Sequence, residues 1–284
     1  MGGPHAVKWR KKQGKKRKLE ETLASTSGEE EEEEEELEDN EQRAVEEEEK
    51  DGDKEAAADE IAGPPVVARP IHGSKKEKGV IFVLEKACLE VGKVGKNFQI
   101  LNSDDHSNYL RKQNRNPADY RPDIIHQALL AIFDSPLTKA GRLQAVYVRT
   151  EKGVLFEIKP HVRMPRTFKR FCGLMSQLLQ KLSITAVGKR EKMLNVIKNP
   201  VSHHLPVDSR RIGLSHSSEK SVNLVDFVVN ASEDSTLVFV VGAMAHGMID
   251  KENLDDFVSI CKDPLSAACC LNRICSALEQ KYNI

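Results

Sequence analysis

Residues 237–247 read LVFVVGAMAHG, a run of branched and aromatic apolar side chains that ends at a glycine. The first part, Leu237 to Val241, is typical of a buried strand. A glycine directly after such a strand, here Gly242, lets a ligand approach the backbone, and Gly247 follows in the same loop. The stretch therefore predicts an α/β fold with a candidate ligand site where its strands end.

The same texture, short β-rich runs alternating with helical periods, extends from Lys78 to the C-terminus. It indicates an α/β domain with a mainly parallel sheet. We expect strands at 80–84, 144–149, 155–158, 194–198, 211–215 and 237–241, with a short one ending near Ile260. We expect helices at 124–133, 167–182 and 265–282.

Two further loops follow predicted strands, Ile212-Gly213-Leu214 and the segment Ile260 to Leu265. In open α/β sheets ligands bind at this edge, and a helix starting near Pro264 would present free N–H groups there. Glycine also ends many strands simply to turn the chain, so both readings stay open. Neither G-x-G-x-x-G nor G-K-[ST] occurs, which disfavours dinucleotide and P-loop sites.

Charge is divided unevenly along the chain, whose formal net charge is -1. Residues 1–73 hold 12 lysines and arginines against 22 acidic residues, and the remainder holds 31 against 22. The acidic segment has too few apolar residues to offset its ordering entropy, so we predict a disordered tail at 1–73 and one folded domain at 74–284. The excess of base in that domain favours an anionic partner, nucleic acid first.

Within the tail, residues 8–18 read KWRKKQGKKRK, two basic clusters around Gln13-Gly14. This pattern is typical of a nuclear import signal or a nucleic-acid-binding arm. A solvated charge run is the alternative.

The segment RMPRTFKRF, residues 163–171, combines arginines with two phenylalanines. On a helix of 100° per residue, an apolar stripe falls within about 80° of Phe168 and comprises Phe171, Met175, Leu178, Leu179 and Leu182. Arg166, Lys169 and Arg170 lie about 100° or more away, so we expect them to face outward together. Arg163 precedes the helix, and its direction depends on how the chain enters at Pro165.

The segment YRPDIIHQALL places Arg121 and Asp123 just ahead of an apolar helix. In one interpretation Asp123 is the helix N-cap and Arg121 a surface charge. In the other, Arg121 contacts a phosphate and Asp123 accepts a hydrogen bond from a base edge.

Several site classes are disfavoured by spacing. The six cysteines show no C-x-x-C pair and read as reduced core thiols, and His203-His204 lacks the further ligands of a metal site, so no metal is expected. The longest apolar run, Leu237 to Ala245, has nine residues against the ~20 of a membrane helix, so no membrane span is expected.

Taken together, the motifs LEKACLEVGKVGK, RPDIIHQALLAIFDSPL, RMPRTFKRFCGLM, VIKNPVSHHLP, VVGAMAHG and DPLSAACC resemble the ribosome-biogenesis methyltransferases called Nep1 or Emg, from about Val80 to Ile284. The resemblance implies a SPOUT-type α/β knot, with a C-terminal trefoil knot and a homodimer. It also implies transfer of a methyl group from S-adenosylmethionine to N1 of a pseudouridine in small-subunit ribosomal RNA.

Carried over by motif, the implied cofactor contacts are Leu214, Gly242, Gly247, Ile260, Cys261, Lys262, Asp263, Pro264 and Leu265. The implied RNA contacts are Arg121, Asp123, Arg163, Arg166 and Arg170. Asp123 would be the catalytic residue, orienting the flipped base or accepting its proton. The family often has Asn-Tyr-Pro-Leu where this chain has Lys262-Asp263-Pro264-Leu265, which leaves the first two side chains without an inherited role.

The implied partners are small-subunit ribosomal RNA, a second copy of the chain and other ribosome assembly factors, in the nucleus and nucleolus. A non-catalytic RNA-binding assembly factor on the same fold is the main alternative. A related knotted enzyme acting on ribose 2'-OH is a third.

Overall fold

The computed structural model describes residues 79–284, except 187–190 and 233. The predicted tail at 1–73 and its basic clusters lie outside the described residues.

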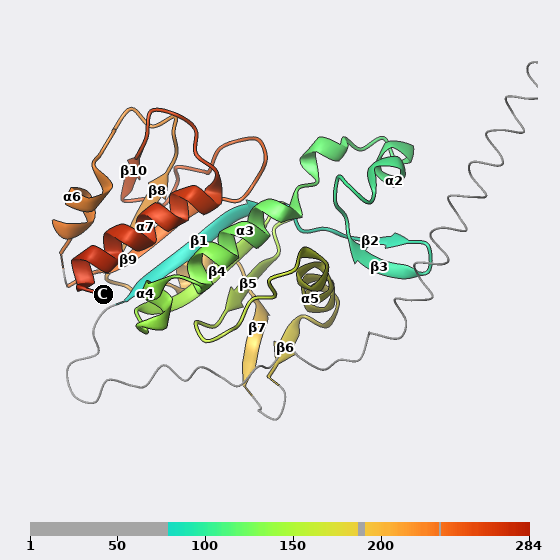
Figure 1. Cartoon of the computed structure of the whole chain (residues 1–284), viewed down its shortest axis with the longest axis horizontal. Helices are drawn as coiled ribbons and strands as arrows, with labels where there is room; N and C mark the ends of the chain where they lie inside the picture. The colour runs from blue at the N-terminus through green and yellow to red at the C-terminus, as the bar shows by residue number, and fades with distance from the viewer. Residues whose placement is uncertain (1–78, 187–190, 233) are drawn as a thin grey trace, which may run out of the picture. The chain divides into compact units, whose positions relative to one another are not determined.

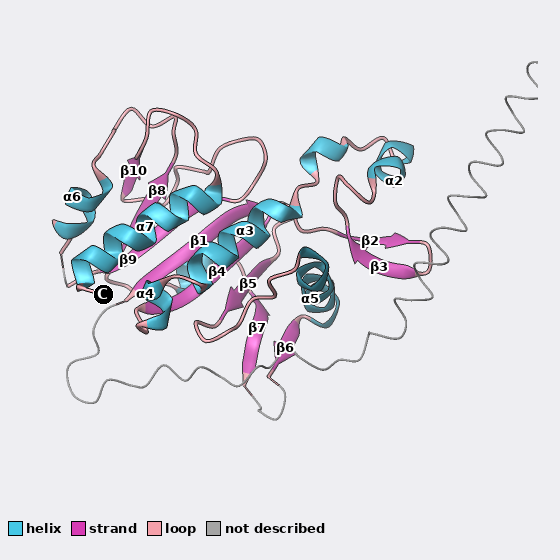
Figure 2. Ribbon diagram, in the orientation of Figure 1, coloured by secondary structure: helices cyan, strands magenta, loops and turns pink. Residues whose placement is uncertain are grey.

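An eight-stranded mixed sheet forms the centre of the described domain, in the order β10-β8-β9-β1-β4-β5-β7-β6 (Figure 2). The first five strands pair in parallel: β10 (Asp256–Val258), β8 (Ser209–Leu214), β9 (Thr236–Gly242), β1 (Val80–Ala87) and β4 (Leu143–Thr150). The last three pair antiparallel: β5 (Leu155–Ile158), β7 (Lys192–Ile197) and β6 (Ser183–Thr185). Each strand expected from sequence is present, with ends that differ by at most three residues.

Helices cover one face of this sheet, where α3 (Pro122–Phe133) and α7 (Ala267–Tyr282) run side by side (Figure 1). The main core lies between these helices and the apolar side chains of β1 and β9, such as Phe82 and Phe239. Three further helices follow in the chain after α3 and before α7, namely α4 (Pro136–Lys139), α5 (Phe168–Lys181) and α6 (Leu224–Val229). A smaller core on the opposite face packs side chains of loops, Leu205 and Leu254 among them, and of the short turn η2 (Val201–His204) against the sheet.

A small lobe is inserted between β1 and α3 and was not predicted from the sequence. It contains β2 (Val91–Val94), β3 (Asn97–Ile100), α2 (Ser107–Lys112) and η1 (Pro117–Asp119). The two strands form an antiparallel hairpin whose turn is Gly95-Lys96, with Gly95 at φ +60°. A two-residue turn that begins with glycine is a hairpin signal, so the sequence did contain the information.

Helix α5 confirms the predicted division between a core face and a charged face, with two corrections. Phe171, Met175 and Leu178 are buried, and Lys169 and Arg170 are exposed. The prediction for Leu182 was wrong, because the helix ends there in the left-handed region (φ +62°) and the side chain is 56% exposed. Arg166 is not helical, since α5 begins at Phe168 with Thr167 as its N-cap.

Strand β10 is held on both sides by one continuous stretch of chain. On one side it pairs with β8, and on the other Ser259 bonds the segment 220–222 through Ser259 N to Lys220 O (2.8 Å) and Val222 N to Ser259 O (2.9 Å). The chain that leads to α7 therefore passes between β8 and the segment that follows it. A threaded chain requires this arrangement, although the trefoil knot itself stays a prediction.

Candidate active site

A cavity of about 310 Å³ lies where β8 and β9 end and α7 begins. Its walls come from three loops, which follow β8, β9 and β10, and from Ile124 in the first turn of α3. Of the cofactor contacts implied from sequence, seven line it: Leu214, Gly242, Gly247, Ile260, Cys261, Asp263 and Leu265. Lys262 and Pro264 belong to the same loop but are not on the wall. The fold thus brings together three loops that the sequence separates.

The loop after β9 depends on its two glycines. Gly247 has φ +110°, a conformation that residues with a Cβ rarely adopt. At Gly242 a Cβ would lie 2.8 Å from the sulfur of Met244, a side chain that lines the cavity and would have to move. Glycine is therefore required at one position by backbone conformation and favoured at the other by close packing.

Lys86, at the end of β1, anchors the far end of the same loop. Its ammonium donates to the Met248 carbonyl oxygen (2.6 Å) and to Asp250 Oδ1 (3.0 Å). Sequence reasoning missed Lys86, because its partners lie more than 160 residues away in the chain.

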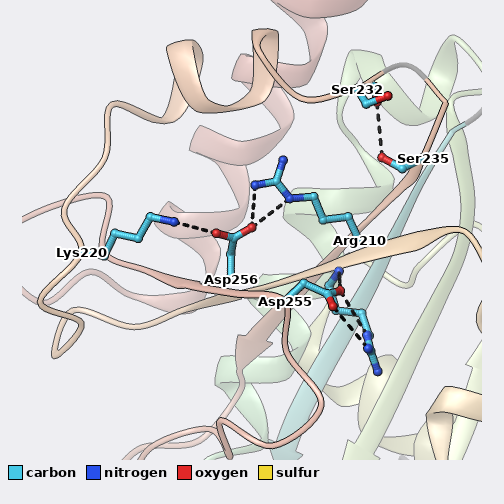
Figure 3. A network of polar contacts seen from close by, with 7 residues as sticks. Arg210, Lys220, Ser232, Ser235, Asp255 and Asp256 are labelled. Carbon is cyan, nitrogen blue, oxygen red and sulfur yellow. Dashed lines mark hydrogen bonds and ion pairs between the residues drawn. The ribbon is translucent and has the colours of Figure 1, made fainter.

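Strand β10, which leads into the third loop, is fixed at its first residue, Asp256, by an ion-pair network (Figure 3). Asp256 accepts both Nε (2.8 Å) and an Nη (2.6 Å) of Arg210 at one oxygen, and the Lys220 ammonium (2.6 Å) at the other. Burial alone would raise the pKa of the Asp256 carboxyl, but the hydrogen bonds from Lys220 and Arg210 outweigh it and lower the pKa. The carboxylate therefore stays charged while it connects β10, β8 and the segment that flanks β10.

Arg121 and Asp123 form a bidentate pair at the start of α3, with N–O distances of 2.8 and 2.7 Å. The N-cap is Arg121, and Asp123 is the second helical residue, so the N-cap interpretation of Asp123 was wrong. The hydrogen bonds from Arg121 lower the pKa of the Asp123 carboxyl, helped by the nearby backbone N–H groups. Ile124, the next residue along the helix, lines the cavity, whereas Arg121 and Asp123 are not among its wall residues.

The other arginines implied as RNA contacts do not all lie around Asp123. Arg163, Arg166 and Arg170 are all exposed. The Arg166 guanidinium lies 3.6 Å from Asp134, at the opposite end of α3 from Asp123 and about 16 Å away along the helix axis. That pair is solvated on both sides, so it leaves Arg166 free to change partner.

His126 in α3 fixes the chain that enters α5. Its Nε2 donates to the Pro165 carbonyl oxygen (2.8 Å), and its ring stacks on Phe171 with centroids 4.5 Å apart. This contact holds the arginine-bearing segment beside α3, and sequence reasoning did not find it.

Few other reactive or ligand-binding groups occur in the described part of the chain. All six cysteines are free thiols; Cys261 and Cys270 line the cavity, and burial raises the pKa of Cys270 to about 12. No cluster of histidine, cysteine and carboxylate side chains suited to a metal ion occurs among the described residues. Of the helices in that region, none has the length and apolar character that crossing a bilayer requires.

Comparison with known proteins gives one consistent result. The model of the EMG1/NEP1 methyltransferase family matches residues 82–279. The chain is 46% identical over 233 residues to the ribosomal RNA small subunit methyltransferase NEP1 of Homo sapiens, covering 81% of this chain and 93% of that protein. Its identity to the protein of the same name in Drosophila melanogaster is also 46%, over 219 residues, covering 75% and 86%.

A solved structure agrees at the level of the fold. The crystal structure of Archaeoglobus fulgidus Nep1 bound to S-adenosylhomocysteine superposes with a TM-score of 0.60 at 22% identity. The match covers 72% of this chain and all of that one.

Proposed function

The chain belongs to the EMG1/NEP1 methyltransferase family, and from this membership we propose that it methylates N1 of a pseudouridine in small-subunit ribosomal RNA, with S-adenosylmethionine as donor. The observation that carries the proposal is the cavity, together with the Arg121–Asp123 pair at the start of the helix that supplies Ile124 to its wall. A donor bound in that cavity and a base held by that pair would be neighbours.

The cavity fits the proposed cofactor in size and chemistry. Its volume is at the lower end of the range for small-ligand sites, ~300–1,000 Å³. Leu214, Ile260 and Leu265 offer apolar walls for an adenine ring, and Asp263 and the backbone of the glycine loop offer polar groups. When bound, S-adenosylmethionine supplies an electrophilic methyl group. Lys262 does not line the cavity, so the departure from the family pattern there is compatible with binding.

Asp123 would position the substrate base more than it would act as a strong base. Because Arg121 lowers its pKa, the carboxyl is ionised at neutral pH and can accept a hydrogen bond from the N1–H of pseudouridine. A weakly basic carboxylate passes the released proton on to water readily. Arg121 in turn keeps the carboxylate oriented through two parallel hydrogen bonds.

The exposed arginines Arg163, Arg166 and Arg170 would bind phosphates of the RNA and set its register. As further parts of the proposal, the chain acts as a homodimer together with other ribosome assembly factors, in the nucleus and nucleolus. The names of its relatives, ribosomal RNA small subunit methyltransferases, support this setting.

The test is methyl transfer to two RNA stem-loops that differ only in having pseudouridine or uridine at one loop position, read by mass spectrometry. We expect methylation of the pseudouridine RNA alone. Asp123→Asn should lower the rate by about 100-fold or more, with RNA affinity nearly unchanged. Asp226→Asn, at an exposed acidic residue in the first turn of α6, is the matched control. Equal losses of rate and affinity in Asp123→Asn would contradict the positioning role.

If the wild-type chain binds the RNA but transfers no methyl group, the non-catalytic assembly factor replaces the enzyme as the better description. Product on the ribose 2'-OH would point to the third reading.

A further inference from the structure

The inserted lobe presents an exposed aromatic ring beside an exposed lysine. In the β2–β3 hairpin, Lys93 and Phe98 are directly paired across the strands, so their side chains leave the same face. Phe98 is 55% exposed and is the one phenylalanine among the exposed large apolar residues in the described part of the chain. An aromatic ring that is held on a strand and open to solvent offers a flat face on which a base can stack.

The lobe also carries cations that its own acidic residues leave unpaired. Lys93, Lys96, Arg111 and Lys112 are exposed and form no ion pair with any described residue. By contrast, Arg115 bonds Glu90 at 2.8 Å. The nearby acidic residues serve the loop before α2: Asp105 accepts from Asn102 (2.7 Å), and Asp104 accepts from Ser103 (3.1 Å). The hairpin itself, residues 91–100, contains two lysines and no acidic residue, so its surface is cationic.

The position of the hairpin connects it to the proposed RNA site at two points. The lobe ends at Arg121, so the Arg121–Asp123 pair is its junction with α3. On the other side, Ser176 of α5 donates its hydroxyl to the Phe98 carbonyl oxygen (3.0 Å), and Figure 1 shows the hairpin next to α5. Ser176 follows Arg170 on the helix by a rise of about 9 Å. RNA bound at Arg170 would thus lie less than two helical turns from the contact between α5 and the hairpin.

We propose that the β2–β3 hairpin is a second RNA-binding surface, which holds the single-stranded RNA that flanks the methylated nucleotide. Phe98 stacks on one unpaired base, and Lys93 and Lys96 contact the neighbouring phosphates. The proposal rests on the proposed function, since it names where further nucleotides of the same substrate bind. A second copy of the chain is a poorer occupant, because a symmetric contact would set the lysines of the two copies against each other.

The experiment measures the affinity and salt dependence of RNA binding by the full chain. The probe is the pseudouridine stem-loop with single-stranded flanks, and the same stem-loop without flanks. Phe98→Ala should weaken binding of the flanked RNA by about 5- to 100-fold, the range for loss of one stacked base. Phe98→Trp should keep the affinity, and Phe98→Leu should lose it, because leucine is apolar but has no aromatic face. For the flankless RNA all four proteins should bind alike.

The two lysines are tested through the salt slope. Lys93→Ala combined with Lys96→Ala should flatten the dependence of log K on log salt by about 1.4, the change for two phosphate contacts on a single strand. Lys139→Ala, an exposed lysine in α4, is the matched control and should leave the slope unchanged. Affinity for S-adenosylhomocysteine should be the same in every variant, since the hairpin contributes no residue to the cavity wall.

Three results would overturn the inference. If the wild-type chain methylates the flanked RNA and the Phe98 and lysine variants bind it equally well, the hairpin has no RNA role, while the proposed function stands. If the wild-type chain neither binds nor methylates the RNA, the proposed function is wrong, and the hairpin proposal that rests on it is wrong too. If Phe98→Ala changes the sedimentation coefficient from dimer to monomer, the hairpin is a contact between copies.

Discussion

Replacing Asp256 by asparagine tests whether one carboxylate holds the cofactor loop in place. The side chain is only 11% exposed and accepts two bonds from Arg210 and one from Lys220. Asparagine has nearly the same shape, keeps one acceptor oxygen and removes the charge. The two cations would then be left beside each other, both above the ring of Phe227.

The expected loss follows from how exposed each partner is. A charge-assisted hydrogen bond from a half-buried guanidinium contributes about 1.5–3 kcal/mol. The Lys220 side chain is 57% exposed, so its bond adds about 0.5 kcal/mol after screening. Asp256→Asn should therefore lower the free energy of unfolding by about 2–3.5 kcal/mol. Because β10 leads directly into the Ile260–Leu265 loop, affinity for S-adenosylhomocysteine should also fall.

Urea unfolding and calorimetry with S-adenosylhomocysteine measure the two effects. Asp255→Asn is the matched control, since Asp255 is 42% exposed and its Arg211 side-chain bonds are longer, 3.3 and 3.4 Å. Its one short bond, 2.7 Å from the Arg211 backbone N–H, can be kept by the asparagine oxygen. Its loss should be about 1 kcal/mol or less. The lowered pKa of Asp256 means that its contribution is complete above the ordinary value of 3.8 and disappears as pH falls through the lower folded-state pKa. The free energies of unfolding of the wild-type chain and of Asp256→Asn should therefore converge at acidic pH. Equal stability losses for the two substitutions at pH 7 would refute the reasoning.

Other substitutions test the loop, the helix and the RNA face. Gly247→Ala should destabilise by about 1–2 kcal/mol and weaken S-adenosylhomocysteine binding, because its φ of +110° disfavours a Cβ. Gly173 lies on α5, and a Cβ added there would meet no other atom, so Gly173→Ala should instead stabilise the fold by about 0.5–1 kcal/mol. Thermal unfolding measures both glycine variants. Leu182→Gly should stabilise by about 0.5–1 kcal/mol, since it relieves a left-handed C-cap, and a lower Tm would contradict this. Arg166→Ala should reduce the salt slope of RNA binding by about one unit with little change in stability, because its pair with Asp134 is solvated; an unchanged slope would return Arg166 to an ordinary surface charge.

The elements that the sequence predicted well are those whose pattern repeats along the chain. The apolar run at 237–241 became β9, and the periodicity around Phe171 became the buried face of α5. The predictions failed where a single local conformation decides the outcome. Leu182 fits the helical stripe in phase, but the helix ends at that residue. The hairpin at Gly95-Lys96 was too short to show a clear alternation, and its turn signal was overlooked.

The sequence by itself determined the α/β class, the long helices, the glycine loops and the family resemblance, because each depends on residues close together in the chain. Only the tertiary structure decided which distant residues meet. It brought three loops and Ile124 together around one cavity. It also bonded Lys86 to the loop after β9 and placed the Arg166 guanidinium beside Asp134. It also bonded Asp256 to two cations from separate segments. The physical reason is that strand order and chain crossing fix these contacts, and neither has a local signature in the sequence.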